Sequence, residues 1–88
     1  MNKIPSPTML EKPLVDALEE LGGKGHRIDV ERVVARNLGI PRELAAEKYD
    51  QGNSGDDTVL QYKLSWAGTA LVKRGVIKKD RGIWSLVS

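Results

Sequence analysis

Apolar residues recur at helical spacing in four stretches of the chain. The first predicts a helix that begins near Lys12, with Pro13 in the first turn, where its missing N–H costs least. The second predicts a helix that is capped by Asp29 and ends at Gly39. A short third helix is expected from Pro41 to about Tyr49. The residues expected to face the core from these helices are Leu14, Ala17, Leu18, Leu21, Val30, Val33, Val34, Leu38, Leu44 and Ala45.

The fourth stretch follows Thr58, which forms a capping-box pattern with Gln61. It predicts a helix over residues 59–74 that ends at Gly75. The apolar stripe of this helix should face the core and consists of Leu60, Leu64, Ala67 and Leu71. The opposite, polar face carries Tyr62, Ser65, Thr69 and Lys73, with Trp66 at its border.

Two short apolar segments near the end of the chain predict a β-hairpin. Residues 76–79 and 83–86 form the strands, and a tight Asp80-Arg81-Gly82 turn joins them. A hairpin alone is marginal in water, so we expect a short strand at residues 26–28 to extend it into a three-stranded sheet over the helices. This order of elements predicts an α+β fold, a winged helix-turn-helix with three to four helices and a C-terminal β-hairpin wing.

The bulk composition describes one ordinary globular domain over residues 1–88. We expect an extended, flexible arm at residues 1–8 and a mobile, glycine-rich surface loop at residues 51–57. The chain has no cysteine, which excludes disulfides and thiolate metal sites and fits a cytoplasmic location. We find neither a signal peptide nor an apolar run near the ~20 residues that a membrane span needs.

Charge is unevenly divided along the chain. Residues 58–88 hold six cations and one anion, a net charge of +5, while residues 1–57 hold eight cations and eleven anions, a net charge of −3. The overall +2 therefore conceals a dipolar protein. A basic C-terminal third favours an anionic partner such as nucleic acid.

These features together resemble the N-terminal winged-helix domain of Mrr-type restriction endonucleases, over most of the chain. The resemblance rests on PLVDAL at residues 13–18, LGIP at residues 38–41, SWAGTALVKRGVI at residues 65–77 and RGIWSL at residues 81–86. A Trp-Ala helix, its Gly-Val-Ile exit and an Arg-Gly-x-Trp wing are more specific in this order than any one of them alone. The chain departs from the family at Gly68, where many members have a larger, often basic residue that can contact DNA.

The resemblance implies a DNA-recognition role in a restriction system that acts on foreign or modified DNA. The nuclease chemistry of such proteins belongs to a separate C-terminal domain, which these 88 residues do not contain. We therefore expect a non-enzymatic module that is linked to a nuclease domain in a longer protein, or else a stand-alone reader. Double-stranded DNA is the expected partner, and no membrane is expected to be one.

The candidate phosphate contacts are basic residues of the helix end and the wing. Lys78 and Lys79 are expected to bind phosphates without reading sequence, and Arg81 at the turn is expected to enter a minor groove. The plainer alternative is that lysines keep a solvated edge strand from aggregating. With about five phosphate contacts, log K should fall with log salt at a slope near −4 to −5. The full set of candidate DNA-binding residues is Gln61, Ser65, Thr69, Lys73, Lys78, Lys79 and Arg81, with Arg74 as a further cation.

The polar face of the long helix supplies the candidate base contacts. Gln61 can read adenine, and Ser65 and Thr69 can bond bases or phosphates, although an ordinary wet helix face would look the same. Trp66 and Trp84 are interpreted as core and sub-core residues that tie the wing to the helix, and base stacking is their alternative role.

No pattern in the chain predicts catalysis, a cofactor or a metal. The single His26 has no Ser or Cys constellation, and residues 22–25 (GGKG) lack the spacing of a phosphate loop. Asp16, Glu19 and Glu20 are interpreted as the wet face of an amphipathic helix. The alternative to DNA binding is a winged helix that docks to another protein or forms a homodimer.

Overall fold

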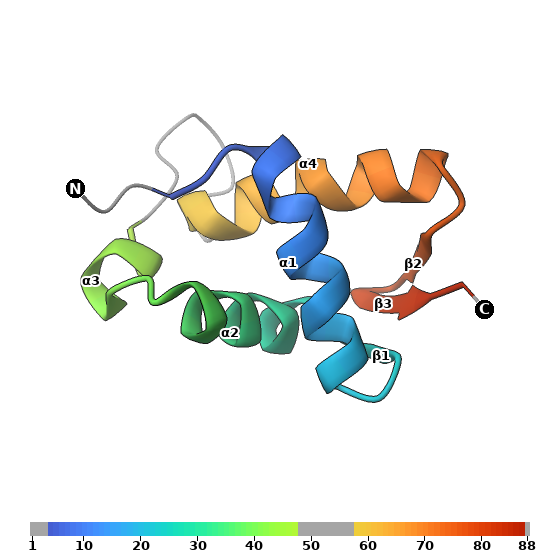
Figure 1. Cartoon of the computed structure of the whole chain (residues 1–88), viewed down its shortest axis with the longest axis horizontal. Helices are drawn as coiled ribbons and strands as arrows, with labels where there is room; N and C mark the ends of the chain where they lie inside the picture. The colour runs from blue at the N-terminus through green and yellow to red at the C-terminus, as the bar shows by residue number, and fades with distance from the viewer. Residues whose placement is uncertain (1–3, 48–57, 88) are drawn as a thin grey trace.

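The computed structural model describes residues 4–47 and 58–87 of the chain. Four helices and three strands follow one another in these ranges (Figure 1). In chain order they are α1 (Pro7–Glu20), β1 (Lys24–His26), α2 (Arg27–Leu38), α3 (Arg42–Ala45), α4 (Val59–Lys73), β2 (Ile77–Asp80) and β3 (Ile83–Leu86).

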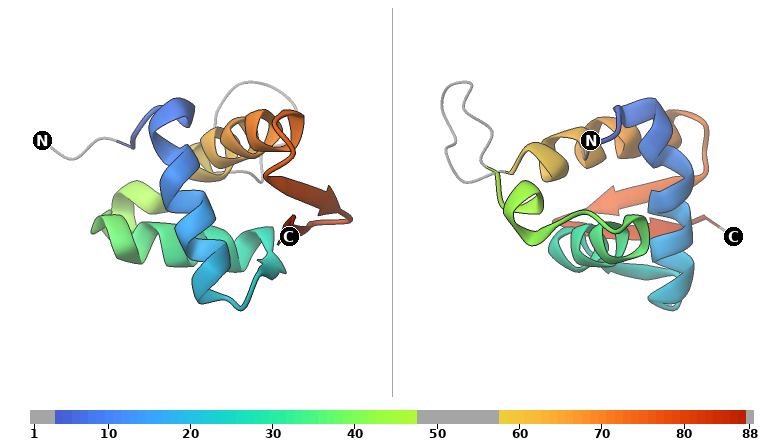
Figure 2. Two further views of the ribbon diagram at one scale, coloured as in Figure 1. Left: turned by 45° about the vertical axis from the view of Figure 1, so that its right-hand side comes forward. Right: turned by 60° about the vertical axis from the view of Figure 1, so that its left-hand side comes forward.

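The helices and the sheet build an α+β winged-helix-like fold, which confirms the predicted fold class. Helix α1 packs against both α2 and α4 (Figure 1). The sheet is antiparallel, in the order β1-β3-β2. Strand β2 lies beside α4 and β1 beside α2, so the sheet runs between these two helices (Figure 2). The sheet is thus held to the helical core along both of its edges.

The hydrophobic core lies where α1, α2 and α4 meet the inner face of the sheet. Most of the predicted core positions are buried, whereas Leu38 at the end of α2 is exposed. Each fully buried leucine stabilises the fold by about 1.5–3 kcal/mol. The buried core residues are Ile4, Leu10, Leu14, Ala17, Leu18, Val30, Val34, Leu60, Leu64, Ala67, Leu71, Ile77 and Trp84.

The first helix starts earlier than predicted, at Pro7 instead of near Lys12. Ser6 is its N-cap, because its hydroxyl accepts a hydrogen bond from the amide of Met9, and Pro7 occupies the first helical position. Pro13 therefore lies inside the helix, where it gives up one backbone hydrogen bond that core packing outweighs. The predicted arm is accordingly wrong for residues 7 and 8, which are helical, while residues 4–6 precede the helix with Ile4 buried, and residues 1–3 lie outside the described ranges.

The second helix also begins earlier than predicted. The strand before it is β1 at residues 24–26 instead of 26–28, and α2 starts at Arg27. His26 is the N-cap in place of Asp29, since its Nδ1 accepts a hydrogen bond of 3.1 Å from the amide of Ile28. Asp29 lies in the first turn, where its charge still suits the helix dipole. The prediction overlooked histidine as a possible cap.

Helix α3 is a single turn that begins after Pro41, as expected, and ends at Ala45. The prediction had extended it to Tyr49, which lies outside the described residues together with the predicted loop at residues 51–57.

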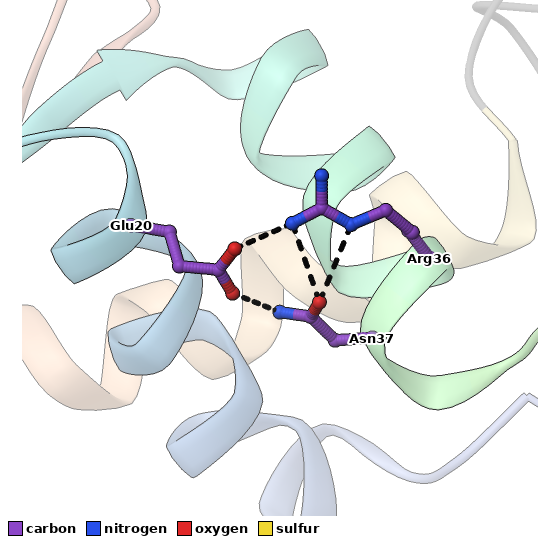
Figure 3. A network of polar contacts seen from close by, with 3 residues as sticks. All are labelled: Glu20, Arg36 and Asn37. Carbon is purple, nitrogen blue, oxygen red and sulfur yellow. Dashed lines mark hydrogen bonds and ion pairs between the residues drawn. The ribbon is translucent and has the colours of Figure 1, made fainter.

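A polar network fastens the end of α1 to the end of α2 (Figure 3). The carboxylate of Glu20 accepts hydrogen bonds from the guanidinium of Arg36 and from the amide of Asn37. The side chains of Glu20 and Arg36 are well exposed, so this ion pair is worth at most about 1 kcal/mol. The network links the two helix ends at the surface, next to the apolar contacts that pack α1 on α2.

Candidate nucleic-acid interface

Helix α4 carries the candidate base contacts, and Thr58 is its N-cap, as the sequence predicts, although the side chain of Gln61 does not complete the predicted capping box. The Thr58 hydroxyl oxygen accepts a 2.9 Å hydrogen bond from the amide of Gln61 and donates a 2.7 Å bond to the Glu31 carboxylate on α2. The cap thereby also fastens α4 to α2. The helix then runs to Lys73, one residue short of the predicted end.

One stripe of α4 points directly away from the core. Tyr62, Trp66, Thr69 and Lys73 follow one another at i, i+4, i+7 and i+11, which places them on a single helix face. Trp66 is 57% exposed, so its prediction as a core or sub-core residue is wrong. Its ring lies edge-to-face against Tyr62, with 6.3 Å between the ring centroids and 77° between the planes. We call these four residues the outer stripe.

Trp84 is the tryptophan that holds the wing to the core, as predicted. It is only 3% exposed and shares the inner face of the sheet with Leu86, which packs on the core. The two tryptophans of the chain thus have different environments, one in the core and one on the surface.

Gln61 does not lie on the exposed face to which it was assigned. It is 2% exposed, and neither amide atom has a hydrogen-bond partner among the described residues. Burial on α4 extends beyond the apolar stripe to the neighbouring sector, which carries Gln61 and, seven residues later, Gly68; at Gly68 this sector lies under Ile77 and Lys79 of β2. A helical wheel identifies the core-facing side but not how much further a neighbouring sheet reaches around it.

Lys79 ties β2 to α4. Its ammonium donates a 3.0 Å hydrogen bond to the carbonyl of Ser65 and lies 4.7 Å from the centroid of the Trp84 ring. Partial burial lowers the pKa of Lys79 below its usual value. A Cβ at Gly68 would come within 2.7 Å of the Lys79 Cε atom, so the glycine is what makes room for this contact. The departure at Gly68 therefore lies under the wing and not on the exposed face.

The strand register separates the two neighbouring wing lysines. Lys79 pairs with Trp84, while Lys78 pairs with Ser85, whose other neighbour is Lys24 on β1. Paired residues share a face of the sheet and successive residues alternate, so Lys78 and Lys24 lie on the outer face and Lys79 on the inner one. The two lysines that are both expected to contact phosphates therefore lie on opposite faces of the sheet.

The turn of the hairpin consists of Arg81 and Gly82 alone, because Asp80, which was predicted to be part of the turn, is the last residue of β2. Arg81 and Gly82 have φ angles of 54° and 83°, and type I′ turns require positive φ at both central positions. The carbonyl of Gly82 accepts a 2.8 Å hydrogen bond from the amide of Arg27 at the start of α2. The wing is therefore short, and it displays Arg81 at a fixed place.

The other cations of residues 58–87 differ in whether they form hydrogen bonds or ion pairs within the described structure. Arg74 forms an ion pair with Glu11, and Lys63 donates a 3.2 Å hydrogen bond to the carbonyl of Ile4. Within residues 4–47 and 58–87, no hydrogen bond or ion pair engages three exposed cations of the basic third, which are Lys73, Lys78 and Arg81.

These three free cations are spread along α4 instead of gathered at one spot. Strand β2 runs back along the helix, because Ile77 lies near Gly68 and Lys79 near Ser65. Arg81 is therefore level with the start of α4 and Lys73 with its end, roughly 15–20 Å apart along the helix axis.

The part of the chain that the structure describes has no group of three histidine, aspartate or glutamate side chains that could hold a metal ion. Asp16 pairs with Lys12, and Glu20 is held by α2, so these carboxylates do not converge. None of the helices within the described ranges has the length and apolar character that a membrane crossing requires.

Comparison with known protein families places the chain in one of them. The model of the family described as the Mrr N-terminal domain matches residues 8–87. No curated protein and no solved structure matches the chain.

Proposed function

Because the chain belongs to the Mrr N-terminal domain family, we propose that it binds double-stranded DNA as the recognition module of a restriction-type protein. The observation that carries this proposal is the outer stripe of α4, which stands exposed with free cations at both ends of the helix. Nothing in the described structure covers this face.

The spacing of the free cations suits a helix lying in a major groove. The major groove of B-DNA is about 12 Å wide, so Lys73 and Arg81, roughly 15–20 Å apart along α4, can reach phosphates on opposite sides of it. Thr69 and Trp66 between them would then face base edges. Lys78, on the outer face of the sheet, adds affinity through its electrostatic attraction to the DNA backbone or through contact with a phosphate beside the groove.

Two of the residues predicted to bind DNA have a structural role in this proposal and do not contact DNA. Lys79 orders the wing against α4, and Gln61 is too deeply buried to reach a base. Ser65 contributes its carbonyl to the wing and keeps its hydroxyl near the outer stripe.

The module itself is proposed to be non-enzymatic. Its described carboxylates do not converge, and in this family nuclease chemistry is expected from a separate C-terminal domain. Where a nuclease domain is linked to this module, cleavage would depend on the DNA that the module binds.

Fluorescence anisotropy with a duplex at several salt concentrations tests the proposal. Three free cations predict that log K falls with log salt at a slope of about −3, less steep than five contacts would give. A single-residue control is Lys78→Gln, which should reduce the slope by about 1. A flat salt response, or no binding at low salt, would contradict DNA binding.

Docking to another protein is the second candidate, and a separate hollow supports it. The hollow has a volume of about 830 Å³ and lies between α2, α3 and the start of α4. Its lining combines an apolar floor with a basic rim and includes Ile28, Ala35, Ile40, Ala45, Arg32 and Arg42. Light scattering distinguishes the candidates, because a stable homodimer that persists with Trp66→Ala but dissociates with Ile40→Asp would favour this surface.

A further inference from the structure

A second, shallower hollow lies on the outer face of α4. It has a volume of about 260 Å³ and is lined by Tyr62, Ser65, Trp66 and Thr69. Two aromatic rings form its wall, since Trp66 leans edge-to-face on Tyr62. The hollow thus occupies the middle of the surface that would face base edges.

The chemistry of this hollow is mostly apolar. The Thr69 hydroxyl donates its only proton in a 3.0 Å hydrogen bond to the carbonyl of Ser65, so Thr69 offers a ligand its methyl group and an acceptor oxygen but no hydrogen-bond donor. The same carbonyl, which lies inside α4, also accepts a hydrogen bond from Lys79. The hydroxyl proton of Thr69 is therefore committed within the protein, and the rings of Tyr62 and Trp66 form much of the remaining lining.

A shallow apolar hollow of this volume fits a small apolar group of a ligand. The edges of base pairs in the major groove carry hydrogen-bond donors and acceptors, and the one apolar group among them is the C5-methyl of a pyrimidine. We propose that the hollow formed by Tyr62, Trp66 and Thr69 receives the C5-methyl group of a pyrimidine in duplex DNA. This inference rests on the proposed function, and it adds the chemical feature that α4 reads.

The positions of the cations support this ligand over a free apolar molecule. Lys73 follows the hollow along the same stripe, and Arg81 lies level with the other end of α4. A methyl group carried by a polyanion matches both features, whereas a neutral ligand would leave the cations without partners. The methyl can come from thymine or from 5-methylcytosine.

Binding to matched duplexes tests the inference. A mixed-sequence duplex is compared with the same duplex in which deoxyuridine replaces every thymidine, and with a third in which 5-methylcytosine then replaces cytosine. Loss of one buried methyl contact should weaken wild-type binding about fourfold. Trp66→Ala should bind all three duplexes alike, so any effect of deoxyuridine on DNA shape would show as a residual difference in this variant. Lys73→Gln is the matched control and should weaken binding to all three duplexes by the same factor.

The outcomes separate the inference from the proposed function. If the wild type distinguishes thymine from uracil, the methyl source is thymine, and if it distinguishes only the 5-methylcytosine duplex, the source is modified cytosine. Salt-dependent binding with equal affinity for all three duplexes overturns the inference and leaves DNA binding intact. Equal losses for Trp66→Ala on every duplex also overturn it. Absence of binding to any duplex overturns both.

Discussion

Gly68→Ala adds a methyl group at the place where the wing is fastened to α4. An ideal Cβ there would lie 2.7 Å from Lys79 Cε and 3.0 Å from Lys79 Nζ, which is too close for the lysine to stay. The next neighbour, the Cδ1 atom of Ile77, lies at an ordinary contact distance of 3.7 Å. We therefore expect the substitution to displace the Lys79 ammonium and little else.

The magnitude follows from opposing effects. Alanine favours a helix interior over glycine by about 1 kcal/mol. Displacing Lys79 forfeits a charge-assisted hydrogen bond, worth about 1.5–3 kcal/mol, and a cation–π contact of about 0.5–1 kcal/mol. Part of this loss is offset because the ammonium regains solvent. We expect a net decrease of about 1 kcal/mol in the free energy of unfolding, and an increase of about 1 kcal/mol when Lys79 is already alanine.

Urea denaturation of the four proteins in this double-mutant cycle measures the coupling between Gly68 and Lys79. We expect about 2 kcal/mol of coupling, with Gly68→Ala reversing its sign between the two backgrounds. An equal change in the free energy of unfolding in both backgrounds would refute the idea that Gly68 leaves the space that Lys79 occupies. Unchanged m-values would show that the cycle compares equivalent transitions.

Other substitutions test the remaining assignments. Trp84→Ala should lower the free energy of unfolding by about 3–5 kcal/mol in urea denaturation, whereas Trp66→Ala should stay within about 0.5 kcal/mol, and similar costs would contradict their assigned positions. Gln61→Met should raise the free energy of unfolding by about 1–2 kcal/mol with unchanged DNA affinity, and loss of affinity would restore Gln61 as a DNA contact. Lys79→Met should change DNA affinity by less than about twofold, while Lys78→Met should lower it and flatten the salt slope by about 1. Burial lowers the pKa of Lys79 in the folded state, so the free energy of unfolding of the wild type should increase as the pH rises toward 10.5. Lys79→Met should lack this increase, and identical pH profiles of the two proteins would contradict the assignment.

The parts of the fold that were predictable from sequence are those with local signals. Helix α4 and the hairpin have a threonine cap, a regular apolar stripe and a turn whose two central residues adopt positive φ, and each was placed within a residue. The start of α1 was not, because Pro13 looks like a first-turn proline as much as Pro7 does. The structure shows that Pro7 begins the helix, since Ser6 caps it and Leu10 in its first turns is fully buried.

The candidate site was less predictable than the fold, because its residues depend on how the sheet meets α4. Gln61 was predicted to be exposed and Trp66 to be a core or sub-core residue, whereas Gln61 is buried and Trp66 is exposed. Lys78 and Lys79 look equivalent in the chain, yet the register puts them on opposite faces. The spacing of apolar residues predicts which side of a helix faces the core. It does not predict which neighbouring side is covered by a strand, because the position of the strand depends on non-local contacts.

The most direct test of DNA binding by α4 uses the two tryptophan indole N–H signals in an NMR titration with duplex DNA. The indole of Trp66 should shift together with the amides of Thr69 and Lys73, and the indole of buried Trp84 should serve as the internal control. Shifts confined to the hollow between α2 and α3, with the Trp66 signal unmoved at saturation, would contradict the assignment of the outer stripe to DNA.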